Sequence, residues 1–214
     1  MIELINIEVH SGEFSIGGVN MVIRSGAYGV LMGRTGSGKS TLLEAIAGLR
    51  NVACGRIRLC GVDVTAMSPA LRGVGFVPQD GALFATMTAR ENLGFALKIR
   101  KAGLETIKKR VDELAKLLGI QHLLDRKPGT FSGGERQRVA LGRALAFSPK
   151  VLLFDEPLSA VDEETREEMF DLLKLVQLET HATILHVTHQ HEEAERLADV
   201  RFRIENGIVL KAGN

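Results

Sequence analysis

The chain has 214 residues, of which 45% are hydrophobic and 25% are charged, and its formal net charge is +1. This length and balance suit one substantial folded domain and exclude an intrinsically disordered chain. The basic residues are dispersed, which argues against nucleic-acid binding, and no apolar stretch approaches the roughly 20 residues that cross a bilayer.

The first 85 residues predict mainly β-strands, because short apolar or alternating runs are separated by glycines. The expected strands are Leu4 to Val9, Val19 to Ile23, Tyr28 to Met32, Gly55 to Cys60 and Val74 to Val77. A short helix from Thr41 to Leu49 follows a glycine-rich loop. We therefore expect an N-terminal antiparallel β lobe.

The two cysteines of this region, Cys54 and Cys60, form no CxxC pair and have no neighbouring histidine cluster. We expect neither a zinc site nor a redox pair there, and we predict buried or half-buried thiols. The N-terminus lacks the basic and apolar regions of a secretion signal, so we expect a cytoplasmic protein.

Residues 86–147 have a helical period and predict an inserted helical lobe. Thr88 and Glu91 fit a capping box at the start of a helix, and Leu104, Val111 and Leu114 share one face of another. After Pro149, strands and helices alternate again. The expected elements are a strand from Val151 to Phe154, a helix burying Met169 and Val176, a strand from Ala182 to Thr188, a helix through Ala194 and Leu197, and a hairpin at Asn206-Gly207.

This alternation predicts an α/β fold with a mostly parallel sheet. We expect one domain over residues 1–214, with a catalytic core and β lobe formed by residues 1–85 and 148–214 and a helical lobe formed by residues 86–147.

The glycine-rich segment from Gly33 to Ser40 matches G-x-x-x-x-G-K-[ST] and lies between an expected strand and an expected helix. Its backbone N–H groups and the helix dipole would hold phosphate oxygens. Lys39 is expected to bridge the β- and γ-phosphates of ATP, and Ser40 to ligate Mg²⁺. A plain turn would not require a lysine and a hydroxyl at these two places. The candidate binding residues are Gly33, Arg34, Thr35, Gly36, Ser37, Gly38, Lys39, Ser40 and Thr41.

Two carboxylates, Asp155 and Glu156, follow the apolar strand that starts at Val151. Open α/β sheets bind ligands at the carboxyl ends of their strands, so we predict that Asp155 holds Mg²⁺ through water and that Glu156 acts on the attacking water. We expect their side chains to diverge because neighbouring side chains on an extended chain point in opposite directions. A strand-ending turn helped by Pro157 is the alternative.

A second glycine-rich segment runs from Phe131 to Glu135. Ser132 as N-cap and Glu135 three residues later would form a capping box, which accounts for these two residues alone. Gly133 and Gly134 stay unexplained, since each glycine within a helix costs about 1 kcal/mol relative to alanine. Their exposed N–H groups suit the close approach of an anion.

With these motifs, the chain from about Phe14 to its end resembles the ATP-binding subunits of ABC transporters, which share a P-loop NTPase core. Ser132, Gly133, Gly134 and Glu135 resemble the family's Leu-Ser-Gly-Gly-Gln signature, which contacts the γ-phosphate held by the other subunit. Phe131 replaces the usual leucine and Glu135 the usual glutamine, which puts a carboxylate near a phosphate. The resemblance implies Mg-dependent ATP hydrolysis by two copies, or by a pseudo-symmetric heterodimer, with two ATP molecules between them.

Four further positions follow from the resemblance. Gln79 corresponds to the Q-loop glutamine, which touches Mg²⁺ or the attacking water, and His189 to the switch histidine, which steadies the γ-phosphate. Asp162 lies in the segment similar to the D-loop, and Phe14 aligns with the adenine-stacking aromatic. Taken alone, Gln79 is a turn residue, Asp162 a helix N-cap, Phe14 a strand core residue and His189 a surface histidine. The other histidines, His122, His181, His186 and His191, are expected to be structural or exposed.

The resemblance also implies transmembrane permease subunits as partners, with this chain peripheral on the cytoplasmic face and not inserted in the membrane. The segment from Asp80 to about Arg100 would receive a helix of the permease, with Phe84, Met87, Leu93 and Phe95 either lining that groove or packing within the lobe. Import is favoured, and the run from Gly12 to Ile16 looks most like molybdate, tungstate or sulfate importers.

Two other functions compete with transport. A GTPase or small-molecule kinase shares the phosphate loop, but no Asn-Lys-x-Asp guanine reader is present. A soluble ABC ATPase of DNA repair, chromosome organisation or translation is the second alternative. It is less favoured because the insertion is short and lacks heptads and cysteine clusters.

Overall fold

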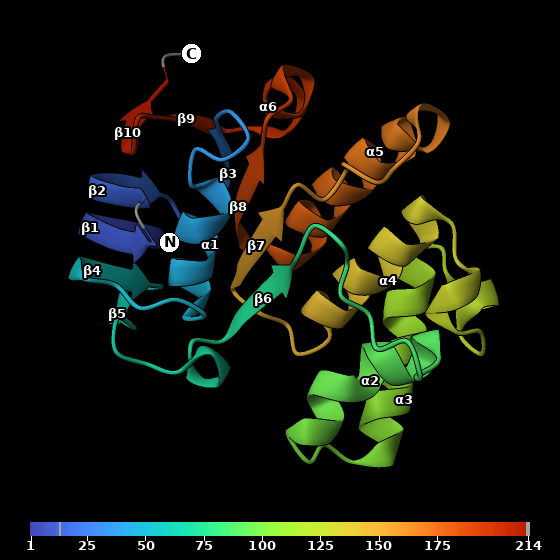
Figure 1. The fold of residues 1–214 in the computed structure, drawn as a ribbon. Coiled ribbons are helices and arrows are strands. Elements are labelled where there is room, and N and C mark those ends of the chain that lie inside the picture. Colours follow the sequence, from blue (N-terminus) through green and yellow to red (C-terminus); the bar gives the residue numbers. More distant parts are fainter. Residues whose placement is uncertain (13, 213–214) are drawn as a thin grey trace. The chain divides into compact units, whose positions relative to one another are not determined.

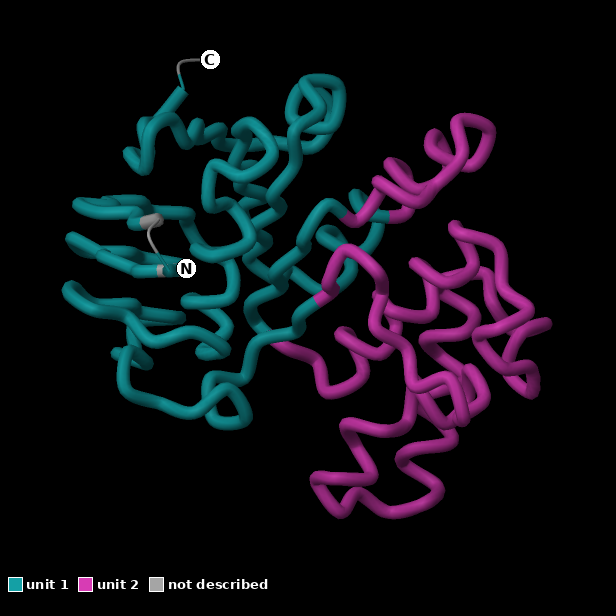
Figure 2. The backbone as a smooth tube through the Cα atoms, in the orientation of Figure 1, with its two compact units in different colours: residues 1–76, 150–156, 173–214 teal, residues 77–149, 157–172 magenta. Residues whose placement is uncertain are grey.

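The computed structural model describes residues 1–12 and 14–212, without the side chains of Ser11 and Phe14. The described chain forms two compact units. The first consists of residues 1–76, 150–156 and 173–214, and the second of residues 77–149 and 157–172 (Figure 2).

The strands are β1 (Ile2–Ser11), β2 (Phe14–Ile23), β3 (Tyr28–Met32), β4 (Cys54–Leu59), β5 (Val62–Asp63), β6 (Val74–Val77), β7 (Val151–Asp155), β8 (Thr183–Thr188), β9 (Val200–Glu205) and β10 (Ile208–Lys211). The α-helices are α1 (Lys39–Ala47), α2 (Ala89–Ile99), α3 (Leu104–Leu117), α4 (Gly133–Leu145), α5 (Glu163–Thr180) and α6 (His191–Leu197). Three short 3-10 helices, η1 (Pro69–Leu71), η2 (Gln121–Leu123) and η3 (Pro128–Thr130), complete the structure.

The first sheet is the antiparallel β lobe, with strand order β2-β1-β4-β5 (Figure 1). In its long strand β1, the buried positions change from even-numbered to odd-numbered residues halfway along. Ile2 and Leu4 are buried before an irregularity in register, and Ile7 and Val9 are buried after it. Asn6 has φ +49° there and its N–H donates to the side chain of Asn20. This bulge lets one strand keep its apolar side chains on the core through a shift of register.

The second sheet has strand order β10-β9-β3-β8-β7-β6, and the pairs β9/β3, β3/β8 and β8/β7 are parallel. Every residue of β7 and β8 is buried, as expected for central parallel strands. The predicted α/β fold with an antiparallel lobe and a mostly parallel sheet is confirmed. Its ligand-binding edge is the carboxyl end of β3, β7 and β8.

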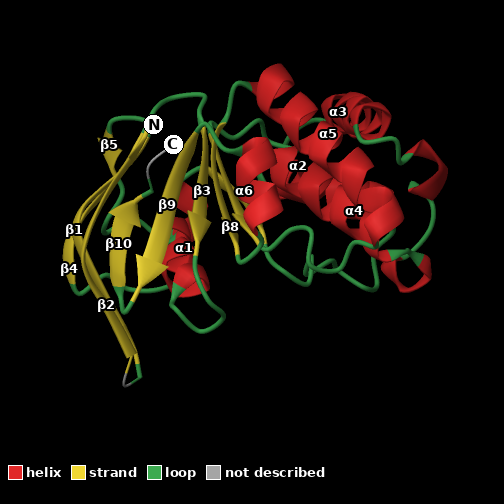
Figure 3. Ribbon diagram, turned by 90° about the horizontal axis from the view of Figure 1, so that it is seen from above, coloured by secondary structure: helices red, strands yellow, loops and turns green. Residues whose placement is uncertain are grey.

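Helix α1 contacts β1 of the first sheet and β7 and β8 of the second, and lies between the two sheets (Figures 1 and 3). Its buried residues Leu42, Leu43 and Ile46 join the main apolar core. Two carbonyl groups at its C-terminal end accept hydrogen bonds from one buried side chain. The Arg72 guanidinium donates to the carbonyls of Ala45 and Ile46, at 2.8 and 2.9 Å. Tertiary packing and this arginine therefore hold the helix whose opposite end receives the glycine-rich loop.

The second unit is mainly helical. Helices α2 and α3 pack on each other, and both pack on α4. The predicted capping box at α2 is present, since Thr88 accepts from the backbone N–H of Glu91 while the Glu91 carboxylate accepts from that of Thr88. Helix α5 crosses the boundary between the two units.

Both cysteines are exposed, so the prediction of buried or half-buried thiols is wrong. Cys54 is in phase with the exposed residues Arg56 and Arg58 on β4, whose buried positions are Ile57 and Leu59. Cys60 lies beyond the strand at φ +50°, in the turn to β5. The alternation of the strand therefore decides the exposure of Cys54, and the turn decides that of Cys60.

Candidate functional site

The predicted phosphate loop connects the end of β3 to the start of α1. Gly36 and Gly38 have φ values of +80° and +95°, which glycine adopts without steric cost. A Cβ at Gly33 would lie 2.6 Å from side-chain atoms of both Ser37 and Ile204. The glycines are therefore needed for the curl of the loop and for its close packing. Thr41 is half-buried in the first turn of the helix.

Lys39 begins α1, and its side chain folds back beneath the loop. Its Nζ is buried, donates to the carbonyls of Gly33 and Arg34 at 3.0 and 3.1 Å, and lies 3.5 Å from Oε1 of Glu156. The loop carbonyls hold the Lys39 side chain at the place where phosphate oxygens would enter. This is the electrostatic requirement of a polyphosphate site.

Ser40 and Asp155 meet although they are far apart in the sequence. The Ser40 hydroxyl donates to Oδ1 of Asp155 at 2.9 Å. Burial of this carboxyl raises the pKa of Asp155 above its ordinary value, against the lowering effect of the Ser40 hydrogen bond. A hydroxyl and a carboxylate side by side are the hard oxygen donors that Mg²⁺ prefers, so the pair fits this ion.

Glu156 has a left-handed backbone with φ +45°, and its N–H donates to the carbonyl of Val187 at 2.9 Å. The divergence of its side chain from Asp155 thus arises from a left-handed turn and not from the extended chain that we expected. Its Oε2 lies 3.0 Å from Nδ1 of His189. Strained backbone of this kind is typical of functional sites.

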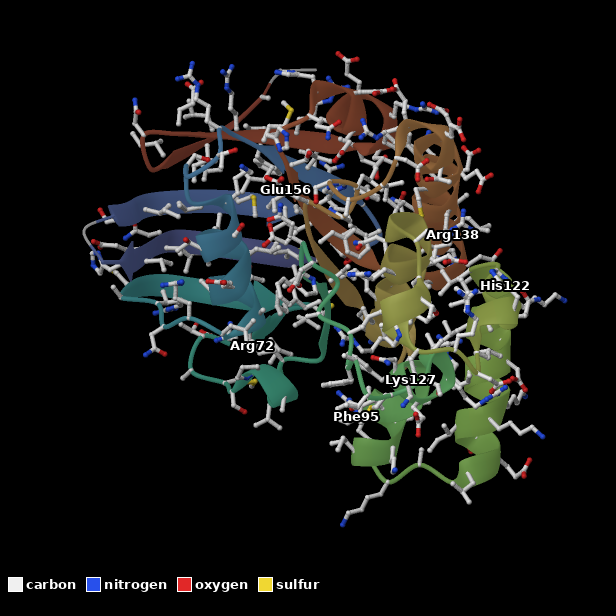
Figure 4. The ribbon with its side chains drawn as sticks, turned by 45° about the vertical axis from the view of Figure 1, so that its right-hand side comes forward. Arg72, Phe95, His122, Lys127, Arg138 and Glu156 are labelled. Atoms are coloured by element: carbon white, nitrogen blue, oxygen red, sulfur yellow. The ribbon has the colours of Figure 1, made fainter. Side chains whose placement is uncertain are left out.

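A pocket of about 830 Å³ opens over this edge of the first unit. One wall is the first half of the phosphate loop, from Gly33 to Ser37, and the other is the β9–β10 hairpin. Arg34, His189, His191 and Arg203 contribute cationic or titratable groups to it. The carboxyl end of β7, where Glu156 is labelled, lies in the same unit (Figure 4). Arg34 and the loop N–H groups suit an anionic ligand, whereas the charge of Arg203 is offset by Glu205, which lies 2.7 Å from it in the same lining.

In the second unit, Ser132 and Glu135 form the predicted capping box at the start of α4. The Glu135 carboxylate accepts from the Ser132 N–H at 2.8 Å, which lowers the pKa of Glu135, and its other oxygen lies 3.3 Å from Nε2 of His122. His122, labelled in Figure 4, was expected to be structural or exposed. Its side chain is exposed and pairs with Glu135, one of the two residues that depart from the family signature, a pairing that no sequence spacing indicates.

The two glycines of this segment differ in their surroundings. A Cβ on Gly133 would collide with the carbonyl oxygen of Ala160, whereas a Cβ on Gly134 would be in ordinary contact with Thr165. Gly133 is thus required by packing against the segment that resembles the D-loop. In that segment, Oδ1 of Asp162 accepts from the N–H of Thr165 at 3.0 Å, which makes Asp162 a cap of α5.

Gln79 is exposed in the segment that follows β6, within the second unit. The next turn is fastened to α4 by Arg143, whose guanidinium donates to the carbonyls of Gly81 and Ala82 at 3.0 and 2.6 Å. The sequence analysis missed this arginine. Phe14 begins β2, and its side chain, which carries the predicted adenine contact, lies outside the described residues.

A glycine loop between a parallel strand and a helix, a buried lysine and a serine–aspartate pair define a P-loop nucleotide-binding domain. Residues 16–159 match the family described as ABC transporter, so the chain belongs to this family. A dimeric ATP-binding cassette solved in a post-hydrolysis state with ADP and Pi is similar over the full length of both chains, with a TM-score of 0.87 and 31% identity.

Curated relatives are also similar. The molybdate/tungstate import ATP-binding protein WtpC of Archaeoglobus fulgidus is 49% identical over 87% of this chain and 77% of its own length. The sulfate/thiosulfate import ATP-binding protein CysA of Thermosynechococcus vestitus is 45% identical over 97% of this chain, and the lactose transport ATP-binding protein LacK of Rhizobium radiobacter is 44% identical over 92%. The chain spans 62% and 54% of these two proteins. In the described residues, no helix is long and apolar enough to cross a membrane.

Proposed function

We propose that this chain binds Mg-ATP and hydrolyses it as the ATP-binding subunit of an ABC importer. The observation that carries the proposal is the meeting of Lys39, Glu156 and His189 at the carboxyl edge of the parallel sheet, beside the Ser40–Asp155 pair. These groups arise from three separate segments of the chain, the start of α1, the end of β7 and the residue after β8. Their convergence is what phosphoryl transfer requires: a cationic cradle, metal ligands and a base close to the γ-phosphate.

Each group has a distinct role in this proposal. The loop N–H groups and Lys39 bind the β- and γ-phosphates, and Ser40 and Asp155 hold Mg²⁺, which neutralises charge on the phosphates. Glu156 orients and polarises the attacking water. His189 fixes the Glu156 carboxylate through the 3.0 Å contact and would donate to the γ-phosphate from its other ring nitrogen.

The signature segment and Asp162 belong to the second unit, and we assign them to the nucleotide held by another copy, as the family resemblance implies. The solved dimeric cassette supports a dimer. Either two copies of this chain or a pseudo-symmetric pair would satisfy this assignment. Gln79 then contributes to Mg²⁺ or the attacking water, and Phe14 to adenine.

Permease subunits are the proposed membrane partners, with this chain bound at the cytoplasmic face. Of the four apolar residues expected to line the receiving segment, Phe84 has 38% of its surface exposed and packs against Phe95 with ring centroids 4.5 Å apart and ring planes tilted by 50°. Leu93 is fully buried, so it packs within the helical unit and cannot line a groove. The Phe84–Phe95 pair, together with half-buried Met87, is the apolar surface that we propose for the permease helix.

An oxyanion of the molybdate, tungstate or sulfate class is the proposed cargo. The names of the Archaeoglobus and Thermosynechococcus relatives support this class, while the lactose relative shows that a similar chain serves another solute. The chain itself carries the ATP chemistry, and the partner subunits select the solute. These relatives also favour transport over the alternative of a soluble ABC ATPase acting on nucleic acid.

Replacement of Glu156 by glutamine tests the proposed chemistry. We expect Glu156→Gln to bind Mg-ATP with unchanged affinity but to lose turnover by about 10²–10³-fold, because the positioned carboxylate is removed while the cradle stays intact. Binding is measured by calorimetry, turnover by phosphate release and assembly by light scattering. The variant should form an ATP-dependent dimer.

Lys39→Ala is the matched control, and it should lose ATP binding. Normal turnover by Glu156→Gln would refute the role of Glu156. Unchanged ATP affinity of Lys39→Ala would show that the loop is not the phosphate site.

A further inference from the structure

Three polar side chains are enclosed in the core of the first unit, and two of them are close to His189 in the sequence. Tyr28 of β3, His186 of β8 and Glu193 of α6 have exposed fractions of 0%, 0% and 1%. The Tyr28 hydroxyl lies 3.0 Å from Nδ1 of His186. On the other side of the ring, Nε2 lies 3.0 Å from Oε2 of Glu193, at ion-pair distance.

The Tyr28 hydroxyl is a hydrogen-bond donor in this cluster. Burial raises the pKa of Tyr28 well above its ordinary value, so its hydroxyl stays protonated and can donate to Nδ1 of His186. Nε2 of His186 then faces the Glu193 carboxylate. Burying three polar groups in an apolar core costs free energy unless each is paired. A core of this kind holds its members in one arrangement.

The cluster joins elements on both sides of the catalytic histidine. His186 lies three residues before His189 within β8, and Glu193 lies four residues after it within α6. The contact between His186 and Glu193 therefore fastens the start of α6 to β8 across the short connection that carries His189. Helix α6 also contacts β3, the strand of Tyr28.

The connection itself is short and hydrogen-bonded. The Thr188 hydroxyl accepts from the N–H of Gln190 at 3.1 Å, and the Glu156 N–H donates to the carbonyl of Val187. The end of β8 is thus tied to the Glu156 turn, and the start of α6 is tied to β8 by the buried cluster. Between these ties, the backbone of His189 has little freedom to move.

We infer that the buried Tyr28–His186–Glu193 cluster positions His189, holding Nδ1 of His189 within 3.0 Å of Oε2 of Glu156. The three residues act through the geometry of the β8–α6 connection, because the contact between His186 and Glu193 joins the two elements that flank His189. The inference rests on the proposed function for its effect on ATP hydrolysis, but the placement of His189 is measurable without ATP.

The first test measures the ring of His189 directly in the nucleotide-free protein. We expect Glu193→Gln and Tyr28→Phe to shift the ring nitrogen resonances of His189 in ¹⁵N NMR spectra, because each weakens the tie between α6 and β8. Glu192→Gln is the matched control, since Glu192 is exposed on the same helix and pairs with Arg196. Unchanged His189 resonances in both cluster variants would overturn the inference whether or not the chain hydrolyses ATP.

The second test separates positioning from general destabilisation by a double-mutant cycle in single-turnover ATP hydrolysis. We expect Glu193→Gln to lower the single-turnover rate constant about tenfold with an unchanged Kd for ATP, because one positioning contact is lost. In the His189→Ala background, the same substitution should change the rate by less than about twofold, because the residue that it positions is gone. An equal loss in both backgrounds would assign the cluster a purely structural role and overturn the inference.

The milder Tyr28→Phe variant, which removes one hydroxyl, serves if Glu193→Gln does not fold. Failure of the proposed function has a different signature: Glu156→Gln would then retain normal turnover, while the NMR result on His189 would stand by itself.

Discussion

At the scale of single residues, Asp155 illustrates the conflict between stability and ligand binding. Its buried carboxyl has a raised pKa, chiefly because burial penalises the charged form. As the pH rises through the ordinary value of 3.8, the unfolded chain releases this proton before the folded chain does. Ionisation of Asp155 at neutral pH therefore destabilises the nucleotide-free fold, and a bound cation would relieve this cost.

We predict that Asp155→Asn raises the melting temperature at pH 7 in the absence of Mg²⁺ and nucleotide. The gain should shrink as the pH falls toward 3.8, because the wild-type carboxyl becomes neutral in both states. Scanning calorimetry at several pH values measures it. Ser40→Ala, which leaves the carboxyl in place, is the control and should not gain stability. A lower melting temperature for Asp155→Asn at pH 7 would contradict the prediction.

At the scale of elements, helix α1 depends on a side chain that comes from outside it. The Arg72 guanidinium donates to four backbone carbonyls, those of Ala45, Ile46, Thr65 and Met67. Two of them are C-terminal carbonyls of α1, of which that of Ala45 also accepts from the N–H of the C-cap residue Gly48. Because α1 begins at the phosphate loop, this arginine anchors the far end of the element that presents Lys39 and Ser40.

We predict that Arg72→Met lowers the free energy of unfolding by about 3 kcal/mol, because buried carbonyls lose charged donors. Urea unfolding measures the change. The control is Arg58→Met on β4, where the side chain is half-exposed and contacts Glu3 at 3.4 Å, and there we expect a change below about 1 kcal/mol. Equal effects of both substitutions would show that the contacts of Arg72 carry no special weight.

At the scale of the whole molecule, the proposed activity requires a second copy. We expect the charge of Glu135 to affect the affinity between the two copies. Its carboxylate caps α4 and pairs with His122. In the proposed dimer it lies near a phosphate, where its charge opposes association. Glutamine would keep the capping oxygen and remove this charge.

We predict that Glu135→Gln, placed in the Glu156→Gln background, strengthens the ATP-dependent dimer by about three- to tenfold in Kd, the effect of removing one charge repulsion. Analytical ultracentrifugation with Mg-ATP measures it. Glu91→Gln is a close control, because Glu91 makes the same capping box at α2, with its carboxylate 2.8 Å from the Thr88 nitrogen. A dimer that is unchanged by Glu135→Gln, or equally strengthened by Glu91→Gln, would contradict the role of this charge.

Local patterns predicted much of this molecule. The Gly33–Ser40 loop was identified because its glycines, lysine and serine are neighbours in the sequence, and both capping boxes were identified because their partners are three residues apart. Strand alternation predicted β3 and β6 with the observed bounds. In contrast, the exposure of Cys54 and Cys60 was predicted wrongly, because a strand's buried face depends on what packs against it and Cys60 lies in the turn after the strand.

The sequence by itself determined the chemistry, because the phosphate loop, the Asp155-Glu156 pair and the signature segment each consist of neighbouring residues. It also determined the α/β class, through the alternation of strands and helices along the chain. Only the tertiary structure decided how separate segments meet. It placed Ala160 against Gly133, His122 beside Glu135, Arg72 on the end of α1, and Tyr28, His186 and Glu193 in one buried cluster. The physical reason is that periodicity and capping act over a few residues, whereas these contacts form only when packing closes long stretches of chain.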